Sequence, residues 1–134
     1  MDVISELVAD ALRQARLVRK CLDAKAIPLL DPRRRMFAVD ISRRIANREI
    51  VNEAFLRDLE AFIVLVGDEV DEGTSFAWRG HEHDPDCGYA IPVRTDRAAA
   101  FRILLDEMVD LATAVEAALD AAEAYTVANA LFEK

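Results

Sequence analysis

The amino-acid sequence predicts an all-α fold: an antiparallel, coiled-coil-like bundle of three long helices, with a short hairpin-like insertion between helices 2 and 3. Glycine and proline are scarce, with 4 of each among 134 residues, whereas a β-sandwich or barrel would need many turns. Apolar residues make up 53% of the chain and recur at helical spacing along most of it. We therefore expect residues 1–134 to form a single helical domain.

The first helix is expected over about residues 2–26. Its apolar positions are three or four residues apart and share one face: Ile4, Val8, Ala11, Ala15, Val18 and Leu22. Pro28 and its neighbours then interrupt the pattern. Asp31 followed by Pro32 predicts the next helix start, because aspartate caps free N–H groups and proline fits the first helical position.

The second helix is expected over about residues 32–70. Its stripe is Phe37, Ile41, Ile45, Arg48, Val51, Phe55, Leu59, Phe62, Val66 and Val70. Arg48 is the one charged member, so it must reach solvent or meet a carboxylate, and we expect an ion pair. Asn47 can cap a new helix, which allows a kink or break near residue 47. Gly73 suits the end of the element.

Residues 74–95 do not follow a helical pattern. The segments Ser75–Arg79 and Tyr89–Val93 are typical of two short strands of a hairpin. An isolated hairpin is only marginally stable, so its apolar side chains need a surface to pack on. The side chains available for that contact are Phe76, Trp78, Tyr89 and Ile91.

The last helix is expected over about residues 96–132. Steps of three and four alternate along Phe101, Leu104, Met108, Leu111, Val115, Ala118, Ala122 and Tyr125, a seven-residue pattern typical of coiled-coil packing. At 1.5 Å per residue, the second and third helices would each be roughly 50–55 Å long and the first nearer 35 Å. The mismatch leaves apolar surface uncovered, so we expect a homodimer.

The sequence also favours a cytoplasmic protein. Asp2 and Glu6 stand where a signal peptide would carry Lys or Arg, and the longest apolar run, Ala61–Gly67, is far shorter than the roughly 20 residues of a membrane-spanning helix. Cys21 and Cys87 lie far apart in unlike contexts and indicate no disulfide framework.

Charge is divided unevenly along the chain. Residues 1–57 hold 12 Lys and Arg against 8 Asp and Glu, a net charge of +4, whereas residues 58–134 hold 5 against 17, a net charge of −12. Such a division fits either helices whose charges pair across their contacts or a charged face that binds a partner.

An arginine patch opens the second helix, where Arg33, Arg34, Arg44 and Arg48 lie on one side of a helical wheel. It could hold phosphates of a nucleic acid. However, the chain is acidic and no aromatic residues alternate with the arginines. We therefore favour pairing with acids of the last helix, namely Asp106, Asp110 and Glu116.

The hairpin loop gathers His81, His83, Asp84, Asp86 and Cys87. Two histidines and a thiolate are a common zinc set, so a metal-binding protein that uses His81, His83, Cys87 and Asp84 is one alternative function. Zinc sites usually draw on two separated ligand pairs, and no second cluster is visible in the sequence. The other interpretation is a solvated hairpin tip whose Asp-Pro and Cys-Gly steps make turns.

Two acidic pairs, Glu49-x3-Glu53 and Glu107-x2-Asp110, resemble the pairs with which MazG-like helical nucleotide pyrophosphohydrolases hold magnesium. The first pair has a different spacing from that family, the separation between the pairs is longer, and the resemblance covers only these four residues. A magnesium-dependent nucleotide pyrophosphohydrolase is the further alternative it implies. No Gly-rich phosphate loop or nucleophile elbow is present, so a non-enzymatic role is favoured.

The sequence thus predicts a small acidic protein that binds another protein as an adaptor, inhibitor or regulator. The acidic half could dock on a basic partner. The expected contact residues are those of interface hot-spot type within the insertion: Phe76, Trp78, Arg79, Tyr89 and Ile91.

Overall fold

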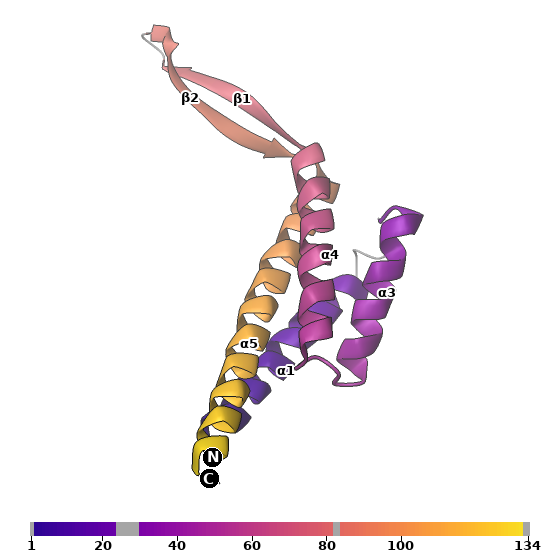
Figure 1. Ribbon diagram of the computed structural model, residues 1–134. Coiled ribbons are helices and arrows are strands. Elements are labelled where there is room, and N and C mark those ends of the chain that lie inside the picture. Colours follow the sequence, from indigo (N-terminus) through magenta and orange to yellow (C-terminus); the bar gives the residue numbers. More distant parts are fainter. Residues whose placement is uncertain (1, 24–29, 82–83, 133–134) are drawn as a thin grey trace.

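The computed structural model describes residues 2–23, 30–81 and 84–132 (Figure 1). Its elements are helices α1 (Val3–Cys21), α3 (Pro32–Ala46), α4 (Glu53–Glu72) and α5 (Asp96–Phe132), and strands β1 (Thr74–His81) and β2 (Asp84–Arg94). A mostly helical fold is confirmed. The bundle of three long helices is wrong, because the expected second helix is divided, so the described residues form four helices and a two-stranded antiparallel sheet.

The division between α3 and α4 follows from the backbone of Arg48. Its φ is 59°, the left-handed region, so the helix cannot continue through it. The Arg48 N–H donates to the Ile45 carbonyl at 3.0 Å and the Glu49 N–H donates to the Arg44 carbonyl at 2.9 Å, which closes the end of α3. Helix α4 then begins after Asn52, whose Oδ1 accepts the Phe55 N–H at 2.7 Å. Arg48 therefore lies in a turn and not on a helical stripe.

Replacing Arg48 by glycine should raise the free energy of unfolding by about 0.5 kcal/mol, because glycine adopts positive φ without the Cβ penalty. Valine at the same position should lower the free energy of unfolding by about 1 kcal/mol or more, since a branched side chain strains this conformation further. Urea denaturation of both variants tests the turn, and an opposite order of their midpoints would contradict it.

The helices pack around one apolar core. Helices α4 and α5 run antiparallel, α1 lies against α5, and α3 lies beside α4 (Figure 1). Each helix contributes fully buried side chains, for example Val18 from α1, Ile41 from α3, Phe62 from α4 and Leu111 from α5. The seven-residue pattern of α5 is buried from Phe101 through Ala118, whereas Tyr125 is exposed because α5 extends past its neighbours.

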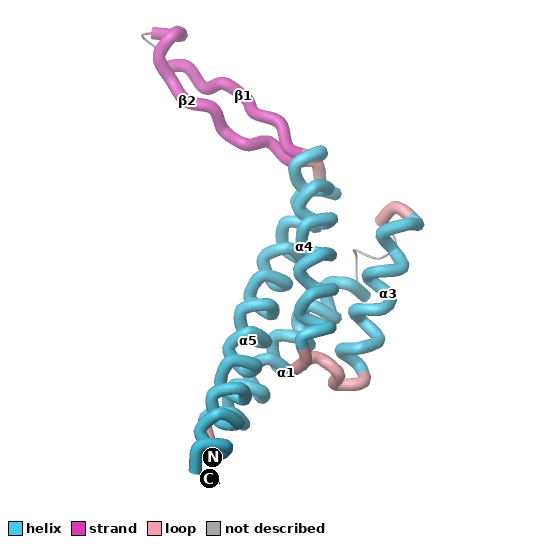
Figure 2. Tube along the Cα trace, viewed as in Figure 1, coloured by secondary structure: helices cyan, strands magenta, loops and turns pink. Residues whose placement is uncertain are grey.

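The two strands form a hairpin that continues from the end of α4 and returns to the start of α5. Their register pairs Thr74 with Arg94 and Gly80 with Gly88, and Thr95 N–H donates to the Gly73 carbonyl at 3.0 Å to close the base. Figure 2 shows the hairpin projecting beyond the helices, at the end of the protein opposite both chain termini.

Within the described residues, no helix is both long enough and apolar enough to cross a lipid bilayer.

Candidate protein-interaction site

The hairpin carries aromatic residues on both faces. Residues that lie opposite each other on paired strands share a face, and neighbours along a strand alternate. Phe76 lies opposite Pro92, and Trp78 lies opposite Ala90, which places these four on one face. Tyr89 lies opposite Arg79 and Ile91 opposite Ala77, which places this second set on the other face. The five expected contact residues are thus divided between the two faces.

The helices do not cover these side chains. Phe76 is 71% exposed, Trp78 56% and Tyr89 59%. A buried aromatic side chain removes roughly 150–250 Å² of surface from water, which is a large stabilising contribution. These three side chains forgo most of it. The described helices therefore do not provide, at these three positions, the packing surface that an isolated hairpin needs. Because the described sheet has only two strands, the outer backbone groups of both strands also face solvent.

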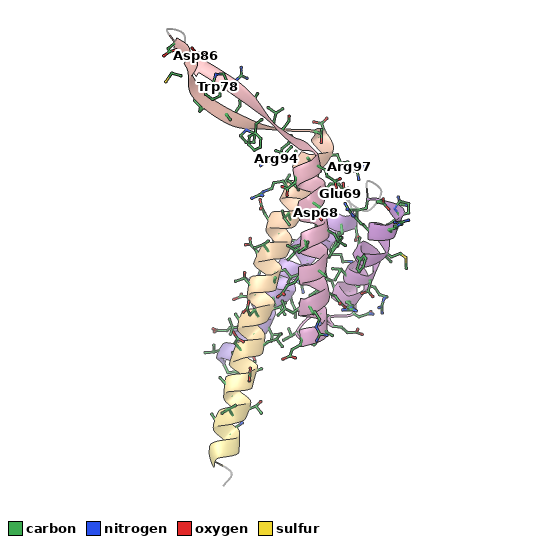
Figure 3. All side chains as sticks on the ribbon, turned by 45° about the horizontal axis from the view of Figure 1, so that its top comes forward. Asp68, Glu69, Trp78, Asp86, Arg94 and Arg97 are labelled. Atoms are coloured by element: carbon green, nitrogen blue, oxygen red, sulfur yellow. The ribbon has the colours of Figure 1, made fainter. Side chains whose placement is uncertain are left out.

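An ion triad centred on the buried Glu69 carboxylate lies at the base of the hairpin. The Glu69 side chain on α4 is 8% exposed, and its Oε1 accepts from Arg34 Nη1 of α3 at 2.7 Å while its Oε2 accepts from Arg97 Nη2 of α5 at 2.9 Å. The Arg97 guanidinium also lies 5.4 Å from the centre of the Phe101 ring. Figure 3 shows Glu69 and Arg97 together at the end of α4 where the hairpin begins. The triad joins three helices directly beneath the candidate interaction site.

A cleft of about 740 Å³ adjoins the triad, and Asp31, Glu72 and Thr95 complete its polar lining. Both arginines already share the Glu69 carboxylate, and the other charged lining residues are acidic. The cleft therefore has no surplus positive charge for an anionic ligand, and we assign the triad a structural role. Glu69 lies three residues after Val66 and directly before Val70, on the apolar side of the helix. A charged residue at that position was the signal in the sequence for this contact.

Two of the four arginines of the patch, Arg34 and Arg44, form ion pairs, as favoured, but their partners are not the expected acids. Within the described residues, neither Arg33 nor Arg48 forms an ion pair, so the ion pair expected for Arg48 is not found. Arg34 binds Glu69, and Arg44 pairs with Asp40 at 3.1 Å and Asp58 at 2.8 Å. These acids lie on α3 and α4, whereas the expected partners were Asp106, Asp110 and Glu116 of α5. The reason is that α3 packs beside α4 and not along α5.

The structure describes only part of the expected zinc site. His83 and the side chain of His81 lie outside the described residues, so the zinc hypothesis stays a prediction. Cys87 and Asp84 are exposed, and Asp84 Oδ1 accepts the Asp86 N–H at 3.1 Å, as in a polar turn.

The acidic pairs of the magnesium hypothesis give it no support. Glu107 Oε2 accepts from Gln14 Nε2 at 2.6 Å, a contact between α5 and α1. Glu53 begins α4, at its far end from the hairpin. No group of three His, Cys, Asp or Glu in the described part of the chain is placed to hold a metal ion.

The two cysteines should differ in reactivity. Burial, and then the negative charge of Glu107, raises the pKa of the Cys21 thiol, whereas Cys87 on β2 is exposed. Because the thiolate is the nucleophile, we expect a maleimide at neutral pH to modify Cys87 at least about ten times faster than Cys21. Mass spectrometry of timed samples, with peptides resolved, measures both rates. Equal rates in the folded protein would contradict the packing of Cys21.

Comparisons with protein-family models, with curated proteins and with solved structures find no significant match to this chain.

Proposed function

We propose that this chain is a non-catalytic protein-binding module, an adaptor, inhibitor or regulator that works in the cytoplasm and uses its hairpin as the contact element. The observation that carries the proposal is the exposure of Phe76 and Tyr89 on opposite faces of a projecting hairpin. A partner that encloses the hairpin would bury both aromatic rings, which are of the type that dominates binding energy at interfaces.

The total surface supports this proposal. The chain exposes 8950 Å², whereas a compact monomer of 15.0 kDa exposes roughly 7,000 Å². The excess is about twice the roughly 800 Å² that each partner contributes to a standard interface. An elongated molecule with a free hairpin has surface to spare for a partner, and a second copy of the chain, as expected from the sequence, is one form that such a partner can take.

The mode of contact we favour is strand addition combined with aromatic anchoring. Each strand of the hairpin has one unpaired edge, to which an extended partner segment can add through main-chain hydrogen bonds. Arg79 and Tyr89, which face each other across the strands, would then provide specificity. The net charge of −8 favours a basic partner, whose association would be faster at low salt.

Site-specific photo-crosslinking in the native host tests the proposal. A photoreactive phenylalanine analogue at position 76 or 89 should capture the same protein, and Leu17, an exposed residue of α1, provides the matched control position. With that partner purified, Phe76→Ser and Tyr89→Ser should each weaken binding by at least about 30-fold, the equivalent of roughly 2 kcal/mol for a hot-spot residue. Equal crosslinking from position 17, or unchanged affinity of both variants, would reject the hairpin as the contact element.

A further inference from the structure

A second uncovered surface lies between α4 and α5. Two hollows, of about 480 and 680 Å³, are lined by residues of these two helices alone. The hollows share no lining residue but follow one another along the same two helices, and we call them together the α4–α5 groove. We define it by the apolar residues and the glycine that line them: Leu56, Ile63 and Gly67 of α4 with Leu105, Val109 and Leu119 of α5. Gln14 of α1 meets Glu107 on another side of α5, so α1 does not close this groove.

Gly67 is the unexpected member of the groove. It lies inside a 20-residue helix, and a Cβ added there would meet no atom within 4 Å. Glycine inside a helix lowers stability relative to alanine. No described neighbour in the chain requires this glycine. Close approach of a second backbone from outside the chain would require it, because only glycine lets two backbones come that near.

The charges around the groove are mostly negative. The hollow nearer the C-terminal end of α5 is bordered by Glu53, Glu116, Asp120 and Glu123. None of these four side chains forms an ion pair within the described residues. At the other hollow, the single basic residue, Arg102, lies 3.3 Å from Asp106 and is therefore already partnered.

We infer that the α4–α5 groove binds a basic amphipathic helix of a partner protein. The apolar face of that helix would lie on Ile63, Leu105 and Val109, with its closest approach at Gly67, and its Lys or Arg residues would face Glu116 and Asp120. This is the helix-in-groove mode of recognition. A second copy docked groove to groove would instead place two acidic borders against each other. The groove is separate from the hairpin, so each proposal can fail alone.

Titration with model peptides tests the inference. The probe is a Leu/Lys peptide of about 18 residues, roughly five helical turns, with leucines at helical spacing. A scrambled peptide of the same composition is its control. We expect micromolar binding of the amphipathic peptide at low salt, with a gain of helical circular dichroism, and at least about tenfold weaker binding of the scrambled peptide. Equal binding of both peptides, or of neither, would overturn the inference.

Variants of the protein locate the binding site. Gly67→Leu fills the groove and should weaken binding at least about tenfold, while its thermal midpoint should not fall, because the space is open and leucine favours helix. Glu116→Lys with Asp120→Lys should weaken binding similarly. The matched control, Asp10→Lys with Asp68→Lys, changes net charge equally at exposed acids that line neither hollow and should change binding less than about twofold.

Three outcomes would overturn the assignment. Gly67→Leu could leave peptide affinity unchanged, or the control pair could weaken binding as much as the Glu116/Asp120 pair, which would show attraction by net charge alone. Sedimentation could also show a dimer of the wild type that Gly67→Leu dissociates, and the occupant of the groove would then be a second copy of this chain.

Discussion

Replacing Phe101 by alanine should lower the free energy of unfolding by about 3–5 kcal/mol, the range for removing a buried aromatic ring. Phe101 is fully buried near the start of α5, and its ring also receives the Arg97 guanidinium at 5.4 Å. The variant loses apolar burial, leaves a cavity and loses the cation–π contact. Since small domains are stable by only about 5–15 kcal/mol, the urea midpoint should fall steeply.

Phe76→Ala is the matched control for this prediction. The same atoms are removed, but from a side chain that is 71% exposed on the hairpin, so the free energy of unfolding should change by less than about 0.5 kcal/mol. Similar losses in the two variants would show that the core does not extend to the base of the hairpin as described.

Replacing Glu69 by alanine should lower the free energy of unfolding by about 2–3 kcal/mol. Removing one member of a buried ion pair commonly costs about 3–5 kcal/mol, because the remaining charge is left without a partner. Here the loss should be smaller, since the Arg97 side chain is 48% exposed and its guanidinium can turn to water. A thermal scan should show a decrease of roughly 5–10 °C for a domain of this size.

The control for Glu69 is its neighbour Asp68, which is exposed. Asp68→Ala removes one negative charge from the same turn of α4 and should change the free energy of unfolding by less than about 0.5 kcal/mol. If Asp68→Ala and Glu69→Ala were equally destabilising, the general charge of this end of α4 would matter, and not the contacts of Glu69 with Arg34 and Arg97.

Local signals in the sequence predicted the ends of elements well. Asp31 with Pro32 begins α3, and the last helix spans residues 96–132 as expected. The break near residue 47 was one option that the sequence left open and was not predicted, because an arginine does not indicate a backbone with positive φ. Glycine or asparagine would have signalled that turn. The helical spacing of Ile45, Arg48, Val51 and Phe55, with Arg48 as the one charged member, therefore made two helices look like one.

Contacts between elements were less accessible to sequence reasoning. The pairing of arginines with acids was expected, but the choice of Glu69 and Asp58 depends on α3 lying beside α4, which no local pattern specifies. For the hairpin, residue types predicted Phe76 and Tyr89 as contact residues, whereas their separation onto opposite faces follows from the strand register. The α4–α5 groove was not predicted, since its openness depends on where α1 packs.

Helix α5 separates the hairpin from the end of the molecule that holds both chain termini (Figure 1). Its 37 residues run without interruption from the foot of the hairpin to the end where both chain termini lie, a span of about 55 Å. A reporter, tether or carrier attached at either terminus would thus be held away from the hairpin by the length of this helix. Labels placed there should leave the hairpin accessible to solvent.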